Sequence, residues 1–194
     1  MCPVLLNRLI VSLFVTLLAA SALSARAQVS PSAYGSQFSI TAGAMVSGFQ
    51  PDYQGGFVAQ AAPNYLYGPG VYVDLKLTHW IQAEAEGRWL HYNQYLNINE
   101  SNYLIGPRLP FTRLRVWRAT PYAKVLIGMG KMNFEFNSAT GSFTDIAYGG
   151  GVDIKVTKRI SLRAVDFEYQ QWPRWVNSSL YPYGVSVGVG YKIF

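Results

Sequence analysis

The sequence predicts an all-β protein: an eight-stranded antiparallel up-and-down barrel that crosses a membrane with its strands. Apolar and polar residues alternate along nearly the whole chain, as they do in half-buried strands. Only 13% of the 194 residues are charged, against about 25% in an average soluble domain. No apolar run in the mature chain approaches the length of a membrane helix, so a crossing would have to be made by a closed sheet.

Residues 1–27 are expected to form a cleaved secretory signal peptide. Arg8 precedes an apolar core from Leu9 to Ala20, and Ala25 and Ala27 put small residues where a signal peptidase cuts. The remaining residues, 28–194, would form one barrel domain that starts at Gln28. The single cysteine of the chain excludes a disulfide framework.

The first four candidate strands differ in how regular their alternation is. They are Gln37–Val46, Gly70–Leu77, Ile81–Leu90 and Tyr103–Phe111. In the fourth, Pro107 and Pro110 cannot donate to a ladder of backbone hydrogen bonds. We therefore expect a bulge or a break in that strand.

The last four candidate strands include one that changes phase. They are Thr120–Gly130, Thr144–Val156, Ile160–Gln170 and Tyr183–Ile193. Arg163 and Asp166 fall on opposite parities of the seventh strand, and a bulge at Ala164–Val165 would bring both to one face. In the eighth strand, large apolar residues alternate with glycine and serine.

Connections of two lengths join these strands. Thr78–Trp80 and Thr157–Arg159 are short, whereas His91–Asn102, Lys131–Phe143 and Gln171–Pro182 are long. Short turns on one rim and long loops on the other are typical of outer-membrane barrels. Aromatic residues of the long loops would then be exposed and available for contacts: Tyr53, Tyr65, Tyr92, Tyr95, Phe134, Phe136, Trp172, Trp175 and Tyr181.

The polar faces of the strands hold seven acids and seven bases, and we expect them to pair in a narrow lumen. This predicted lumenal charge network is Asp74, Lys76, Glu84, Glu86, Arg88, Arg108, Lys124, Asp145, Asp153, Lys155, Arg163, Asp166, Glu168 and Lys192. A soluble ligand-binding barrel is the alternative. It would expose the glycines of the eighth strand to water and crowd large residues inside, so the pattern favours the membrane barrel.

Aromatic residues lie near the predicted ends of the outward faces. Such girdles mark the two membrane interfaces of barrels. The interface aromatics are expected to be Tyr67, Trp80, Trp89, Phe111, Tyr148, Tyr169, Tyr183 and Tyr191.

From about residue 37 to 194 the chain resembles the small OmpA-like and opacity-type outer-membrane barrels of Gram-negative bacteria. The segments that carry the resemblance are 103–108, 121–128, 149–153, Arg163 with Asp166, and the aromatic C-terminus. The family's assembly signal resembles the C-terminal pattern of Ser186, Gly188, Tyr191, Ile193 and Phe194, with either Ile193 or Phe194 as its key residue.

No residue pattern indicates an enzyme. His79 and His91 fall on opposite rims of the predicted topology, and no G-x-S-x-G motif is present in the sequence. The pair Glu84 and Glu86 has the residue type for acid–base chemistry, but its period-2 spacing fits the lumenal network better. We expect no catalytic residue, cofactor or metal.

The sequence therefore predicts a non-enzymatic integral outer-membrane barrel with a structural or surface-contact, adhesin-like role. A narrow porin-like channel and a soluble periplasmic ligand-binding barrel remain open as alternatives. Expected partners are outer-membrane lipids, lipopolysaccharide, the barrel-assembly machinery during insertion and a surface partner of the long loops. The protein is expected to be a monomer and to bind no nucleic acid.

Overall fold

The structure, a computed structural model, describes residues 38–51, 65–92, 98–134, 139–175 and 178–194. The predicted signal peptide lies outside these residues. No helix among the described residues is long and apolar enough to span a membrane.

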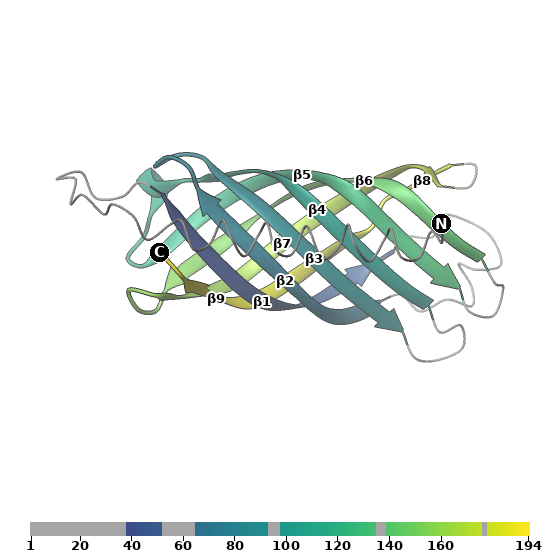
Figure 1. The fold of residues 1–194 in the computed structure, drawn as a ribbon, viewed down its shortest axis with the longest axis horizontal. Helices are drawn as coiled ribbons and strands as arrows, with labels where there is room; N and C mark the ends of the chain where they lie inside the picture. Colours follow the sequence, from purple (N-terminus) through teal and green to yellow (C-terminus); the bar gives the residue numbers. More distant parts are fainter. Residues whose placement is uncertain (1–37, 52–64, 93–97, 135–138, 176–177) are drawn as a thin grey trace, which may run out of the picture. The chain divides into compact units, whose positions relative to one another are not determined.

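The described residues form nine antiparallel strands, eight of which close a barrel (Figure 1). Neighbouring strands follow the order β6-β5-β4-β3-β2-β1-β9-β7, and the additional pairing of β6 with β7 closes the ring. The short strand β8 pairs with β7 outside that ring. The predicted eight-stranded up-and-down barrel is confirmed. The strands are β1 (Ser39–Gln50), β2 (Leu66–Lys76), β3 (Gln82–Tyr92), β4 (Ile98–Pro110), β5 (Ala119–Phe134), β6 (Ala139–Lys155), β7 (Ile160–Trp175), β8 (Ser178–Leu180) and β9 (Tyr183–Lys192).

Several strands are longer than the alternation predicted. β5, β6 and β7 have 16, 17 and 16 residues, whereas about 9–11 tilted residues cross a bilayer. Most of the described part of the predicted loops His91–Asn102, Lys131–Phe143 and Gln171–Pro182 is strand. Those loop predictions were wrong, because the ladder of each hairpin continues beyond the span needed for crossing.

One predicted irregularity is present and the other is not. The register of β7 shifts between Arg163 and Asp166 against β9, which confirms the bulge at Ala164–Val165. The bulge or break expected in β4 is wrong, since Arg108 keeps its register opposite Gln82 and Lys124. Pairing with β5 is interrupted only at Gly106 and Pro107, so the missing proline amide costs a local gap without a shift.

The two short turns have the same pattern of hydrogen bonds to a threonine side chain. Thr78 Oγ1 accepts hydrogen bonds from the backbone N–H of Trp80 at 3.3 Å and of Ile81 at 3.0 Å. Thr157 Oγ1 accepts the equivalent bonds from Arg159 at 3.2 Å and Ile160 at 2.9 Å. A hydroxyl that accepts backbone hydrogens in this way stabilises a tight turn. Between β4 and β5 lies the 3-10 helix η1 (Thr112–Leu114).

The barrel is apolar outside and polar inside, the reverse of a soluble protein. Side chains such as Val73, Ile105 and Ile127 are exposed on the outer face. Glu84, Arg163 and other charged residues are buried in the lumen. This arrangement suits a barrel surrounded by lipid, where only the interior can hold charges.

Lumen-facing glycines make room for aromatic rings from neighbouring strands. A Cβ at Gly43 would overlap the Tyr72 ring, one at Gly184 the Phe49 ring and one at Gly130 the Trp172 ring. Glycine on these faces therefore lets rings fold flat inside a barrel of only eight strands.

Gly128→Ala should destabilise the barrel, because the added Cβ would overlap the carbonyl oxygen of Tyr103 on β4. We expect a loss of about 1–3 kcal/mol in the free energy of unfolding, measured by urea titration in lipid vesicles. Gly87→Ala is the matched control. Its Cβ would meet Tyr103 ring atoms at ordinary distances of 3.4 Å and above. Equal losses in both variants would contradict the packing argument.

Candidate functional site

The lumen consists of four chemically distinct layers. A cavity at the short-turn end is followed by an ion network, then by amide side chains, then by an apolar cluster at the long-loop end. The ion network consists of the residues joined by ion pairs: Asp74, Glu84, Glu86, Arg88, Arg108, Lys124, Asp153, Arg163, Asp166 and Glu168.

Lys124 is one of the two hubs of the ion network. Its Nζ lies 3.3 Å from Glu84 Oε1, 3.0 Å from Glu86 Oε2, 2.7 Å from Asp166 Oδ2 and 3.0 Å from Glu168 Oε2. The lysine and all four carboxylates are buried. One ammonium therefore bridges carboxylates from β3 and β7 on opposite sides of the lumen.

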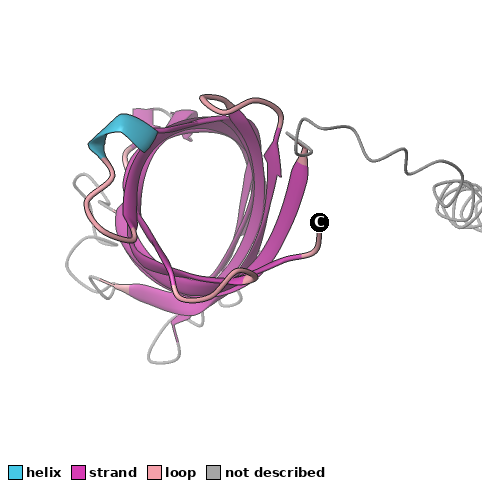
Figure 2. Cartoon of the chain, turned by 90° about the vertical axis from the view of Figure 1, so that its left-hand side faces the viewer, coloured by secondary structure: helices cyan, strands magenta, loops and turns pink. Residues whose placement is uncertain are grey.

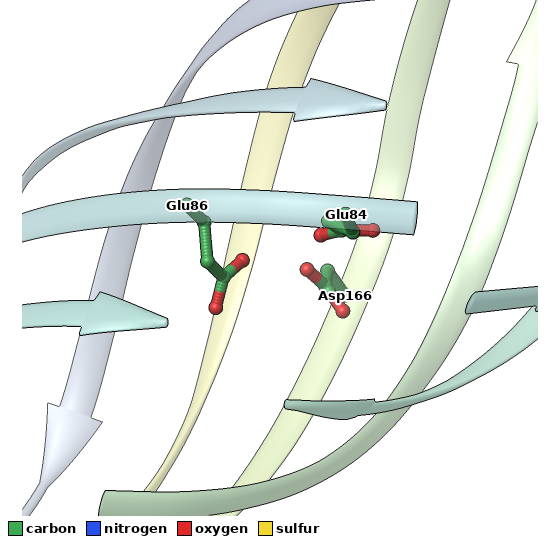
Figure 3. Close-up of side chains that lie close together, drawn as sticks. All are labelled: Glu84, Glu86 and Asp166. Atoms are coloured by element: carbon green, nitrogen blue, oxygen red, sulfur yellow. The ribbon is translucent and has the colours of Figure 1, made fainter. Parts of the chain in front are cut away.

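Three of these carboxylates have the geometry of a cation site. Glu84, Glu86 and Asp166 each offer an oxygen within 4.8 Å of the others, and they face one another across β3 and β7 (Figure 3). The Lys124 ammonium already contacts all three, so it takes the place that a metal ion would hold. The cluster is therefore an internal salt-bridge centre.

Arg163 is the second hub and also pairs with four carboxylates. Its Nη1 lies 2.8 Å from Glu84 Oε1 and 3.3 Å from Asp166 Oδ2, and its Nη2 lies 3.2 Å from Asp74 Oδ2. Its Nε lies 3.7 Å from Asp153 Oδ1. These contacts tie β7 to β2, β3 and β6.

The remaining two arginines complete the network. Arg88 binds Glu168 with both terminal nitrogens, at 2.7 and 2.9 Å. This bidentate geometry is the strongest that an arginine and a carboxylate form. Arg108 pairs with Asp74 at 2.6 Å, with Glu84 at 3.3 Å and with Asp153.

Aromatic rings flank the guanidinium groups. Arg163 lies with its Cζ 3.7 Å from the centre of the Tyr72 ring, and Arg108 lies at the same distance from that of Tyr122. Cation–π contacts of this kind attract most strongly where water is excluded. The two tyrosine rings therefore contact these guanidinium groups in addition to the carboxylates that pair with them.

The sequence predicts equal numbers of acids and bases in the lumenal network, but the ion network of the structure does not contain equal numbers. Ten of the fourteen predicted residues form the ion network, and the structure places the others differently. Lys155 and Lys192 are exposed at the short-turn end and Lys76 is half-buried there; none of the three has an ion pair with a described residue. Asp145 is buried and has no ion pair with a described residue. The two-residue alternation of the strands assigned these four residues to the lumenal network. The position of a residue along the barrel axis, however, decides whether it can form an ion pair.

A layer of amides and one acid continues the network toward the long loops. Gln170 donates to Glu168 at 2.8 Å and accepts from Trp172 Nε1 at 3.1 Å. Asn102 donates to Gln170 at 3.1 Å and to Glu100 at 3.0 Å. Glu100 and Asn102 are absent from the predicted lumenal network because both fall in the predicted loop His91–Asn102. Their even numbers continue the parity of Arg108, which is the signal that marks them as lumenal.

An apolar cluster closes the lumen at the long-loop end. This apolar plug consists of Phe49, Leu66, Leu90, Met132, Trp172 and Leu180, with Phe143 packed against it. Trp172 had been expected as an exposed loop aromatic, and the structure shows it fully buried. Its ring stacks on Phe143 with centroids 6.1 Å apart. The prediction for Trp172 was wrong because β7 carries this residue into the barrel.

The predicted interface aromatics all lie on the outside of the barrel. Trp89 packs edge-on against Tyr103 and donates to its hydroxyl at 3.0 Å. Tyr191 accepts a hydrogen bond from Arg159 at 3.0 Å. The exposed members are Tyr67, Trp80, Trp89, Phe111, Tyr148, Tyr169, Tyr183 and Tyr191.

The residues of the predicted assembly signal occupy the end of the last strand. Ser186 is buried and its hydroxyl pairs with that of Ser47 at 2.8 Å. The Ile193 N–H still donates to Ile40 at 2.8 Å, whereas both Ile193 and Phe194 have exposed side chains. Their role in assembly stays a prediction.

A family model described as an outer membrane protein beta-barrel domain matches residues 15–192. The chain belongs to this family. It is thus an outer-membrane β-barrel, which agrees with its apolar outer face and its polar lumen. No curated protein matches the sequence.

Solved structures of other outer-membrane barrels have the same fold. Neisserial surface protein A has a TM-score of 0.60 at 12% identity, covering 80% of this chain and 97% of its own. The outer membrane protein OprG from Pseudomonas aeruginosa has a TM-score of 0.52 at 9% identity, covering 80% of this chain and 96% of its own. At such identities the likeness concerns the fold alone.

Lys124→Met should destabilise this outer-membrane barrel at neutral pH by about 3–5 kcal/mol, because it leaves four buried carboxylates without their shared cation. The loss should shrink as the pH falls, since a protonated carboxyl needs no cation. Urea unfolding in vesicles at several pH values measures both effects. Lys131→Met, at an exposed lysine of the same strand, should change little. A pH-independent loss, or equal losses in both variants, would contradict the hub role of Lys124.

Proposed function

We propose that the protein is a closed, non-enzymatic outer-membrane barrel that serves a structural and surface-contact role. One observation carries this proposal: buried side chains of the ion network and the apolar plug occupy the middle and the long-loop end of the lumen. A barrel with an occupied interior has to act through its outer surface and its rims.

The occupied lumen argues against a porin-like channel. The interior of an eight-stranded barrel is only just wide enough for its own side chains. A permeating ion would have to displace Arg88 from its two-point contact with Glu168 and then pass the apolar plug. Both steps cost energy, because the first unpairs buried charges and the second removes the ion from water.

The long-loop rim is the surface best suited to contacts with other molecules. β5, β6 and β7 are longer than a bilayer crossing requires, so they lift this rim above the membrane surface. Tyr65 is exposed there, and Tyr181 stacks on Tyr169 with centroids 6.0 Å apart. Tyrosines that combine an apolar ring with a hydroxyl favour binding at wet interfaces. Lipopolysaccharide is the proposed neighbour of this rim.

The purified protein should give no steady conductance in planar bilayers, because the ion network and plug block the lumen. A large porin inserted into the same membranes is the positive control. Stable, voltage-independent current steps from the folded protein would overturn the closed-barrel proposal and favour the narrow channel.

Replacing residues 52–64 and 93–97 with glycine–serine segments of equal length should reduce attachment of expressing cells to a lipopolysaccharide-coated surface. The barrel itself should still fold, which heat-modifiable migration on gels would show. The matched control replaces the short turn residues 157–159 in the same way. Unchanged attachment of the variant with both replacements would contradict a surface-contact role for these two segments.

A further inference from the structure

A cavity of about 730 Å³ opens at the short-turn end of the barrel. Figure 2 faces this end and shows η1 and the turns around the rim of the barrel. The walls come from the ends of the strands, and the floor includes Arg108, Asp74 and Asp153 of the ion network. We call this cavity the basic vestibule. Its volume is typical of pockets for small molecules.

The charge of the basic vestibule is strongly positive. Two acids line it, Asp74 and Asp153, and both are already paired with Arg108 and Arg163. The other bases around it have no ion pair with any described residue. They are Arg118 and, closer to the strand ends, Lys76, Arg115, Lys155, Lys158, Arg159 and Lys192.

These bases lie close enough to repel one another. The positive charges of Arg115, Lys76 and Lys192 all act on Lys155 at the end of β6. Lys76, Lys155 and Lys192 come from three different strands, so their convergence follows from the fold and not from one basic segment. A cluster of like charges destabilises the free protein, and a bound anion would relieve that repulsion.

Hydroxyl groups stand between the bases. In the strand register Lys76 lies opposite Ser39, Lys192 opposite Thr41 and Lys155 opposite Ser161. All three hydroxyl residues line the basic vestibule. Ammonium and guanidinium groups interleaved with hydroxyl donors are the groups that bind phosphate oxygens.

We propose that the basic vestibule is a binding site for compact molecules that carry several phosphate groups. This goes beyond the structural and surface-contact role, because it concerns the opposite rim, which faces the periplasm in outer-membrane barrels. The paired floor and the apolar plug stop the ligand in the vestibule, so the site binds the anion and does not transport it.

Two sources could supply such phosphates: soluble phosphate compounds and phospholipid headgroups. The bases converge on a cavity inside the ring of strand ends, whereas headgroups surround the outside of that ring. A soluble ligand therefore fits the placement better, and the test separates the two sources.

The experiment uses inorganic tripolyphosphate as the probe and the full barrel in phosphatidylcholine nanodiscs, with binding measured by calorimetry. Binding should weaken as salt is raised, because exposed charges are screened. Lys155→Gln/Lys192→Gln should weaken it by about tenfold. The control Arg113→Gln/Lys131→Gln removes two exposed charges outside the basic vestibule and should leave binding unchanged. Unfolding midpoints of both double variants should match that of the parent.

Each outcome decides the question. Absence of binding by the parent protein, or equal weakening in the two double variants, would overturn the proposal. Equal affinity in discs that also contain phosphatidylglycerol supports a soluble ligand. Loss of tripolyphosphate binding in those discs, restored when the anionic lipid is left out, supports the same site with headgroups as its occupant.

Discussion

Charges inside a barrel that is surrounded by lipid have to be stabilised by pairing with one another, and the rest of this structure depends on how that is done. Four buried cations, Arg88, Arg108, Lys124 and Arg163, connect carboxylates from β2, β3, β6 and β7 across the lumen. A register slip by one residue would turn such a carboxylate or cation toward lipid. The network therefore selects the register of six strands at once.

Two strands, β1 and β9, carry no residue of the ion network. β1 and β9 lie next to each other, and their lumenal residues include glycines and the paired Ser47 and Ser186. The space that they leave is occupied by the Tyr72 ring, which also lies against Arg163. Glycines of β1 and β9 thus make room for the ring that lies against this network cation. The charged fraction of the chain is low because the outside of the barrel faces lipid.

Much of the fold could be predicted because a strand repeats every two residues. Parity identified the lumenal face, the outward face and the bulge at Ala164–Val165. Parity does not report depth, however, and the errors share this cause. Trp172 was assigned to a loop although its even number continues that of Glu168, and Lys155 was assigned to the pairing network although it lies at the mouth. Which cation meets which carboxylate depends on barrel closure, which brings β3 opposite β7, and no local pattern contains that information.

The two ends of the lumen differ in chemistry, and the difference explains where the surplus positive charge of the protein lies. Toward the long loops the network gives way to a layer of amides with the buried Glu100 and then to the apolar plug. Toward the short turns the nearby acids, Asp74 and Asp153, are already bound by Arg108 and Arg163. Cations beyond them have no acid left to pair with. Pairing thus engages both acids near the short turns and leaves a basic rim without partners, a surface whose charge is set by the network beneath it.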